Sequence, residues 1–113
     1  MLNEYLTLDD IIDVAEDLGW TVKVFDDYVM FENWTDHAGQ DLVIETDSVD
    51  PHEVIDYVID FARGYDVDDE VETFVEFRGQ RGVPERIRDI IKDCEEAESL
   101  YAELADELYK LMV

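Results

Sequence analysis

The sequence predicts a single α+β domain over residues 1–113, with four mainly antiparallel strands, helices packed on the sheet and a long C-terminal helix. Three observations predict this class: apolar residues at helical spacing behind capping residues, short segments that alternate apolar and polar residues, and a C-terminal heptad pattern. A chain of 113 residues has the size of one domain. The expected order of elements is αβββαβα.

The first helix is expected at residues 8–18 and leads into a β-hairpin. Thr7 and Asp10 have the spacing of a capping box, and Gly19 ends the apolar periodicity. A period of two in residues 20–24 and 28–31 then indicates the hairpin, and residues 42–46 indicate a third strand after a polar loop at 33–40.

The second half of the chain is expected to form two helices with one strand between them. Asp50 followed by Pro51 starts a helix over residues 51–63, and Gly64 ends it. After an acidic turn at residues 66–70, the alternation in residues 71–76 indicates the fourth strand. Pro84 opens the last helix.

That last helix keeps a heptad seam from Ile87 to Leu111, formed by Ile87, Ile90, Cys94, Ala97, Tyr101, Leu104, Leu108 and Leu111. Burial of the seam within one molecule is the preferred interpretation. The alternative is a homodimer in which the distal part, Tyr101 to Leu111, pairs with a second copy. The chain is therefore expected to be a monomer or a homodimer through the C-terminal helix.

The charge of the chain restricts its partners. With 8 Lys plus Arg against 32 Asp plus Glu, the net charge is −24, which excludes direct nucleic-acid binding and disfavours an anionic membrane surface. A hydrophobic fraction of 47% still predicts a folded core. The lone Cys94, the lack of an apolar leader and the lack of a membrane-spanning apolar run favour the cytoplasm.

The acidic residues are concentrated and patterned. Residues 1–77 hold 2 basic and 23 acidic side chains, a net charge of −21, whereas residues 78–113 carry a net charge of −3. Carboxylates form stripes opposite the apolar faces of the first two helices, at a spacing comparable to that of successive phosphates along a nucleic-acid strand. The candidate partner-binding acids are Asp9, Asp13, Asp17, Glu53, Asp56 and Asp60, followed by Asp66, Asp68 and Asp69.

No catalytic, metal or cofactor site is expected. Residues 66–77 resemble a calcium loop, but Val71 stands where the turn needs Gly and Phe77 stands where the loop needs Glu. Cys94, His37 and His52 do not have zinc-ligand spacing, and no nucleophile has a recognisable base beside it. The chain is therefore expected to be non-enzymatic.

Trp34 is the aromatic candidate for an interface. Exposed beside Tyr28, Asp36 and His37, it would anchor a partner, because Trp and Tyr dominate binding hot spots. The equally weighted alternative is that Trp34 folds back over the sheet edge.

In size, charge and α+β pattern the chain is similar to the small acidic anti-CRISPR and anti-restriction proteins of phages and mobile elements. The segment Phe31–Asp41 and the Gly82-Val-Pro84 entry to the last helix also resemble small acidic proteins from mobile elements of gut Firmicutes. The resemblance implies a DNA mimic in a bacterial host cell, which would occupy the basic cleft of a CRISPR effector or restriction enzyme.

Two alternatives remain open from the sequence. The chain could be an intracellular module that masks another basic protein, or its acidity could reflect adaptation to a salt-rich cytoplasm without mimicry, since Asp outnumbers Glu and Lys is scarce.

Overall fold

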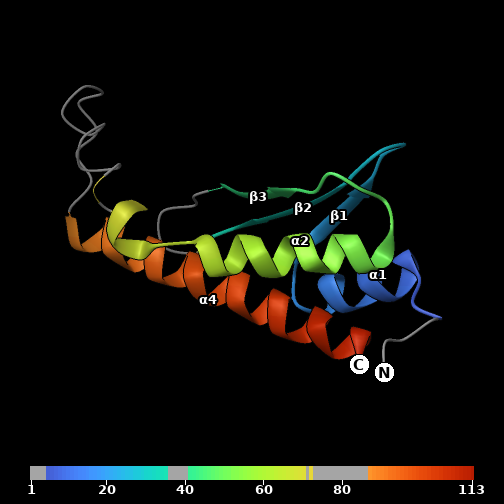
Figure 1. The fold of residues 1–113 in the computed structure, drawn as a ribbon. Helices are drawn as coiled ribbons and strands as arrows, with labels where there is room; N and C mark the ends of the chain where they lie inside the picture. Colours follow the sequence, from blue (N-terminus) through green and yellow to red (C-terminus); the bar gives the residue numbers. More distant parts are fainter. Residues whose placement is uncertain (1–4, 36–40, 71, 73–86) are drawn as a thin grey trace.

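The computed structural model describes residues 5–35, 41–70, 72 and 87–113, which form an α+β fold (Figure 1). The elements, in chain order, are α1 (Leu8–Asp17), β1 (Thr21–Val24), β2 (Val29–Trp34), β3 (Asp41–Glu45), α2 (Pro51–Gly64) and α4 (Ile87–Met112). Each has a predicted counterpart whose bounds agree to within a few residues.

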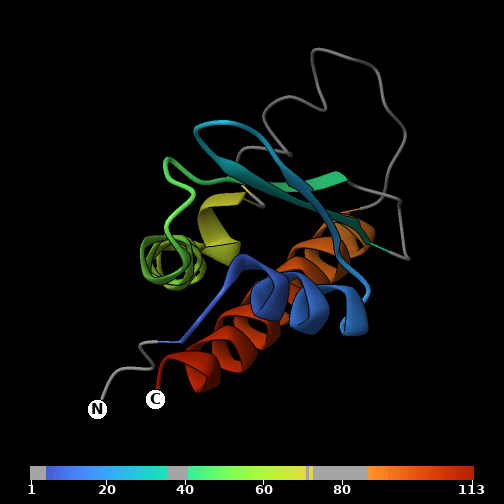
Figure 2. The same cartoon turned by 90° about the vertical axis from the view of Figure 1, so that its right-hand side faces the viewer.

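The three strands form one antiparallel sheet in the order β1-β2-β3, and the three helices lie on the same face of it (Figures 1 and 2). Phe31 of β2 pairs with Ile44 of β3, and both side chains are buried against the helices. Because successive residues of a strand point to opposite faces, Glu32, Trp34 and Val43 belong to the outer face. Trp34 and Val43 are exposed there.

The core lies between the sheet and the helices, and α4 contributes its heptad seam to it. Tyr101 is central, because its ring lies 5.9 Å from that of Trp20, 5.0 Å from that of Phe61 and 5.1 Å from that of Tyr65. Of the described seam residues, Cys94, Ala97, Tyr101, Leu104 and Leu108 are buried, and Leu111 is half-buried. From Cys94 to Leu108 the seam therefore packs within one molecule, as expected.

Caps fix both ends of α1. The Thr7 side chain accepts a hydrogen bond from the Asp10 amide, and the Asp10 carboxylate accepts one from the Thr7 amide, which completes the predicted capping box. Gly19 has a positive φ of 96°, which lets the Trp20 amide donate back to the Ala15 carbonyl at 2.9 Å. The chain therefore reverses into β1 and carries Trp20 into the core.

The connection from β3 to α2 is held by side-chain hydrogen bonds. The buried Thr46 hydroxyl accepts from the Val29 amide and donates to the Val29 carbonyl, each at 2.9 Å. Two residues further on, the Ser48 hydroxyl donates to Glu53 and accepts from the Asp50 amide at 3.0 Å. These bonds set the position of the intervening Asp47 beside the first turns of α2.

Two predictions need correction. Asn33 and Trp34 continue β2 instead of starting a loop, because they pair with Leu42 and Asp41. The acidic turn predicted at residues 66–70 is helical from Val67, as is Glu72, the second residue of the predicted fourth strand. The remainder of that strand lies outside the described residues, and the sheet formed by the described residues has three strands.

The physical reason for the second correction is a helix cap. The Asp66 carboxylate accepts from the Asp68 amide at 2.9 Å, and the Glu70 amide donates to the Asp66 carbonyl at 3.0 Å. Acids in a first helical turn are further stabilised by the helix dipole. The cap therefore explains why residues 67–70 are helical where a turn was predicted.

Within the part of the chain that is described, no helix has the length and apolar character needed to cross a membrane.

Candidate functional site

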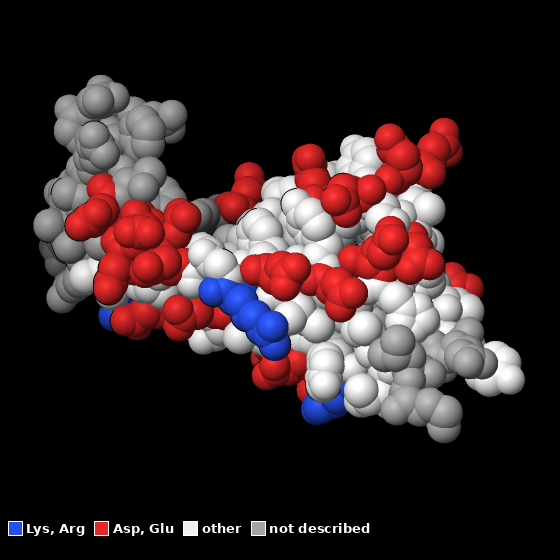
Figure 3. Space-filling model, viewed as in Figure 1, with Lys and Arg blue, Asp and Glu red and all other residues white. Residues whose placement is uncertain are grey.

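The exposed face of α2 carries a row of carboxylates. Glu53, Asp56 and Asp60 are exposed at i, i+3 and i+7, opposite the buried Val54, Ile55 and Val58. In Figure 3 the side of the molecule formed by α2 shows acidic side chains in a band, with basic groups occurring singly below it. The structure therefore brings the three predicted α2 acids together on one surface.

This surface is hollowed. A shallow depression of about 360 Å³ is lined by Asp47, Glu53, Asp56, Tyr57 and Asp60. Asp47 reaches it from the connection between β3 and α2, and the half-buried Tyr57 adds an aromatic ring. We call these five residues the acidic depression.

Sequence reasoning missed Asp47 and Tyr57 because neither belongs to the stripe pattern. Asp47 is two residues beyond β3 in a loop, where periodicity gives no information. The signal that could have identified Asp47 is its short distance in sequence from Asp50, the N-cap of α2. A connection this short must fold against the first turns of the helix.

The carboxylates of the acidic depression are not all equally available. The Glu53 carboxylate accepts a hydrogen bond from the Ser48 hydroxyl. In contrast, Asp47, Asp56 and Asp60 make no ion pair with any described residue. Among the described residues, no three His, Cys, Asp or Glu side chains converge as metal ligands would. The carboxylates are spread along a surface, which suits several separate cationic groups.

The predicted acids of α1 occupy another part of the surface. Asp9, Asp13 and Asp17 are exposed at i, i+4 and i+8, opposite the buried Ile11 and Ala15. Figures 1 and 2 place α2 on one side of the helical layer and α1 on another, with both helices packed on α4. The two stripes therefore form two separate surfaces instead of one continuous array.

The acids at residues 66–69 have a partly structural role. Asp66, Asp68 and Asp69 are all exposed, but the Asp66 carboxylate caps the helical residues that follow it. The Asp66 carboxylate is thus engaged by backbone amides and is not a freely available contact group.

Trp34 is 57% exposed, which favours the anchor interpretation over burial at the sheet edge. Its predicted neighbours are not all beside it. Tyr28 precedes the other end of β2, where its ring stacks on Phe25 at 4.6 Å. Asp36 and His37 lie outside the described residues. The cross-strand partner of Trp34 is Asp41, at the start of β3.

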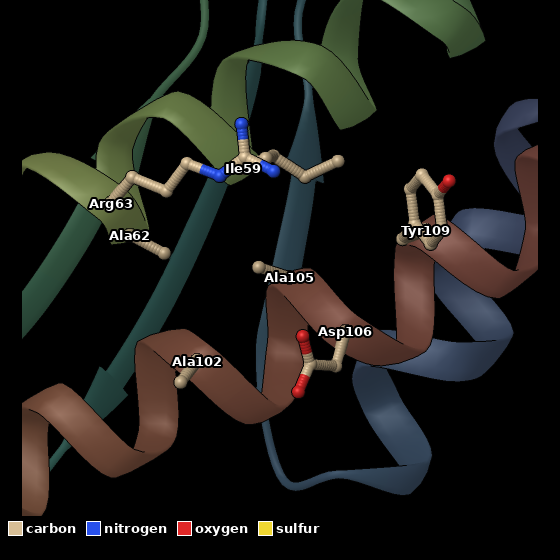
Figure 4. A pocket seen from close by; sticks show the side chains of 7 residues that line it. All are labelled: Ile59, Ala62, Arg63, Ala102, Ala105, Asp106 and Tyr109. Carbon is tan, nitrogen blue, oxygen red and sulfur yellow. The ribbon is translucent and has the colours of Figure 1, made fainter.

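A larger hollow of about 460 Å³ lies between α2 and α4 (Figure 4). Ile59 and Ala62 of α2 face Ala102 and Ala105 of α4, and the charged groups are Arg63 on α2 and Asp106 on α4. This groove is mainly apolar and carries one charge of each sign. It lacks the acidic character that the predicted partner-binding surface requires.

Cys94 does not offer a reactive thiol. Its side chain is fully buried in α4, and burial raises the pKa of the thiol. A thiol that stays protonated lacks the thiolate that nucleophilic catalysis requires.

The described residues thus present a hollowed carboxylate surface on α2, a separate acidic stripe on α1 and an exposed Trp on the sheet. Comparisons with protein-family models, curated proteins and solved structures find no match to this chain.

Proposed function

We propose that the protein is a non-enzymatic inhibitor of a DNA-targeting defence nuclease, such as a CRISPR effector or restriction enzyme. It acts as a DNA mimic by placing the acidic depression of α2 in the basic DNA-binding cleft. The observation that carries the proposal is the clustering of Asp47, Asp56 and Asp60, whose carboxylates have no ion-pair partner among the described residues.

A surface of this kind reduces the stability of the helix that carries it. Like charges at helical spacing destabilise α2 by a few tenths of a kcal/mol per pair. A solvated surface without a partner would interleave Lys and Arg among the acids. A partner rich in Arg compensates the repulsion, because guanidinium groups bind carboxylates through paired hydrogen bonds. Opposite fields also accelerate the encounter of the two proteins.

The experiment compares two variants of equal charge. Asp56→Lys with Asp60→Lys changes the α2 surface, and Asp13→Lys with Asp17→Lys changes the α1 stripe by the same four charges. Plasmid cleavage by an RNA-guided nuclease and by a restriction enzyme is measured against rising concentrations of each variant. Circular dichroism verifies folding.

We expect inhibition of at least one nuclease class, relieved by excess duplex DNA. The α2 variant should lose potency by roughly tenfold or more, since interfacial charge pairs dominate such contacts, and the α1 variant should lose much less. Equal losses would mean that net charge alone binds the nuclease. Inhibition that excess DNA does not relieve would instead point to masking of a basic surface outside the DNA cleft.

A further inference from the structure

Trp34 lies at one end of the outer sheet face in a second small depression, of about 210 Å³. The depression is lined by Thr21, Glu32, Asn33, Trp34, Asp41, Leu42 and Val43. Of the two Trp residues, Trp20 is buried in the core and Trp34 is exposed on this face. Trp is one of the residue types most enriched at binding hot spots, so an exposed Trp34 in a depression is a candidate anchor.

The register of the sheet sets carboxylates on both sides of the indole. Asp41 is the direct cross-strand partner of Trp34, and Glu32 precedes Trp34 by two residues on the same strand. All three side chains therefore project from one face. The ring thus has one carboxylate across the strand pair and one along its own strand.

The two carboxylates differ in their partners. Glu32 forms an ion pair with Lys23 of β1, with 3.3 Å between the Lys23 Nζ and Glu32 Oε2 atoms. The Asp41 carboxylate makes no ion pair with any described residue. Asp41 is therefore the group at this depression whose charge a partner would neutralise.

We infer that this depression binds an arginine side chain of the partner protein. The planar guanidinium would stack on the Trp34 indole and donate hydrogen bonds to the Asp41 carboxylate. Arginine fits better than lysine, because its charge is delocalised over a flat group that both stacks and donates in pairs, whereas an ammonium is compact and strongly hydrated. The inference rests on the proposed function, since it names a second contact with the same arginine-rich partner.

The test uses two synthetic peptides of equal length and charge, one of alternating Arg and Gly and one of alternating Lys and Gly. Binding at 150 mM NaCl is followed by fluorescence anisotropy of a label on the peptide. Intrinsic Trp emission is recorded in parallel. Because Trp20 is buried, a change in emission on binding reports Trp34.

The wild-type protein should bind the Arg peptide more tightly than the Lys peptide, with a change in Trp emission. Trp34→Ala and Asp41→Asn should each weaken Arg-peptide binding by about fivefold and reduce the preference for Arg. Trp34→Phe, which keeps an aromatic ring, should retain part of the preference for the Arg peptide. The control is Tyr109→Ala, which removes an exposed aromatic ring from α4 and should leave the preference unchanged.

The outcomes separate the two proposals. If Trp34→Ala leaves the Arg preference intact while the Asp56→Lys, Asp60→Lys variant still lowers binding of both peptides, the arginine pocket is wrong and the acidic α2 surface stands. If Trp34→Ala removes the preference but reversal of the α2 charges has no more effect than reversal of the α1 charges, the pocket stands and the α2 surface is wrong. Binding without any change in Trp emission also overturns the pocket.

Discussion

At the scale of single residues, Tyr101 shows how burial controls ionisation in this core. Burial raises the pKa of the Tyr101 hydroxyl to about 12, with a smaller contribution from the charge of Glu70. In the unfolded chain the hydroxyl has its ordinary pKa of about 10. The protonated form is thus favoured by folding, so this contribution to stability is complete below pH 10 and is lost as the pH rises from about 10 to about 12.

Tyr101→Phe should therefore reduce the loss of stability at alkaline pH. The free energy of unfolding, measured with urea at pH 8, 10 and 11, should fall less steeply in Tyr101→Phe than in the wild type. Tyr109→Phe is the matched control, because Tyr109 is 53% exposed on the same helix and should leave the slope unchanged. Identical slopes for the wild type and Tyr101→Phe would contradict a buried, protonated Tyr101.

At the scale of elements, the N-terminus of α2 positions the acidic depression, and its cap should be measurable on its own. The Asp50 carboxylate accepts from the Glu53 amide at 3.1 Å. Asp50→Ala should lower the free energy of unfolding by about 1 kcal/mol, because the cap satisfies an amide that otherwise lacks a partner. Asp47→Ala, in the same loop, should change it by less than about 0.5 kcal/mol. Urea unfolding of both variants tests this, and equal effects would show that charge removal, not capping, sets the stability.

At the scale of the whole molecule, the net charge of −24 makes stability depend on ionic strength. Repulsion is screened over about 10 Å at 0.1 M salt and about 3 Å at 1 M. Because an extensive core opposes this repulsion, we expect a cooperative thermal transition already at 0.1 M NaCl, with the melting temperature rising towards 1 M. Melting followed by circular dichroism in NaCl and KCl would test this. A chain that is unfolded at 0.1 M and folds in molar salt would favour salt adaptation over mimicry.

The local elements of the fold follow from the sequence of neighbouring residues. Caps at Thr7 and Asp50 and the periodicity of α1, α2 and α4 are interactions within one or two helical turns, so they can be predicted from neighbouring residues. The seam of α4 was predicted from spacing for the same reason. The prediction failed at residues 66–70, where a run of acids was interpreted as a turn although Asp66 caps the helical residues that follow it.

The grouping of the charges, in contrast, depends on how the elements pack against one another. Periodicity assigns each acid to a face of its own helix, but the packing of α1 and α2 on α4 decides that their stripes form separate surfaces. The strand register likewise places Asp41 beside Trp34, although six residues separate them in the chain. Asp47 joins the acidic depression because hydrogen bonds of Thr46 and Ser48 fold its loop onto α2. Such contacts between elements leave no periodic pattern in the sequence.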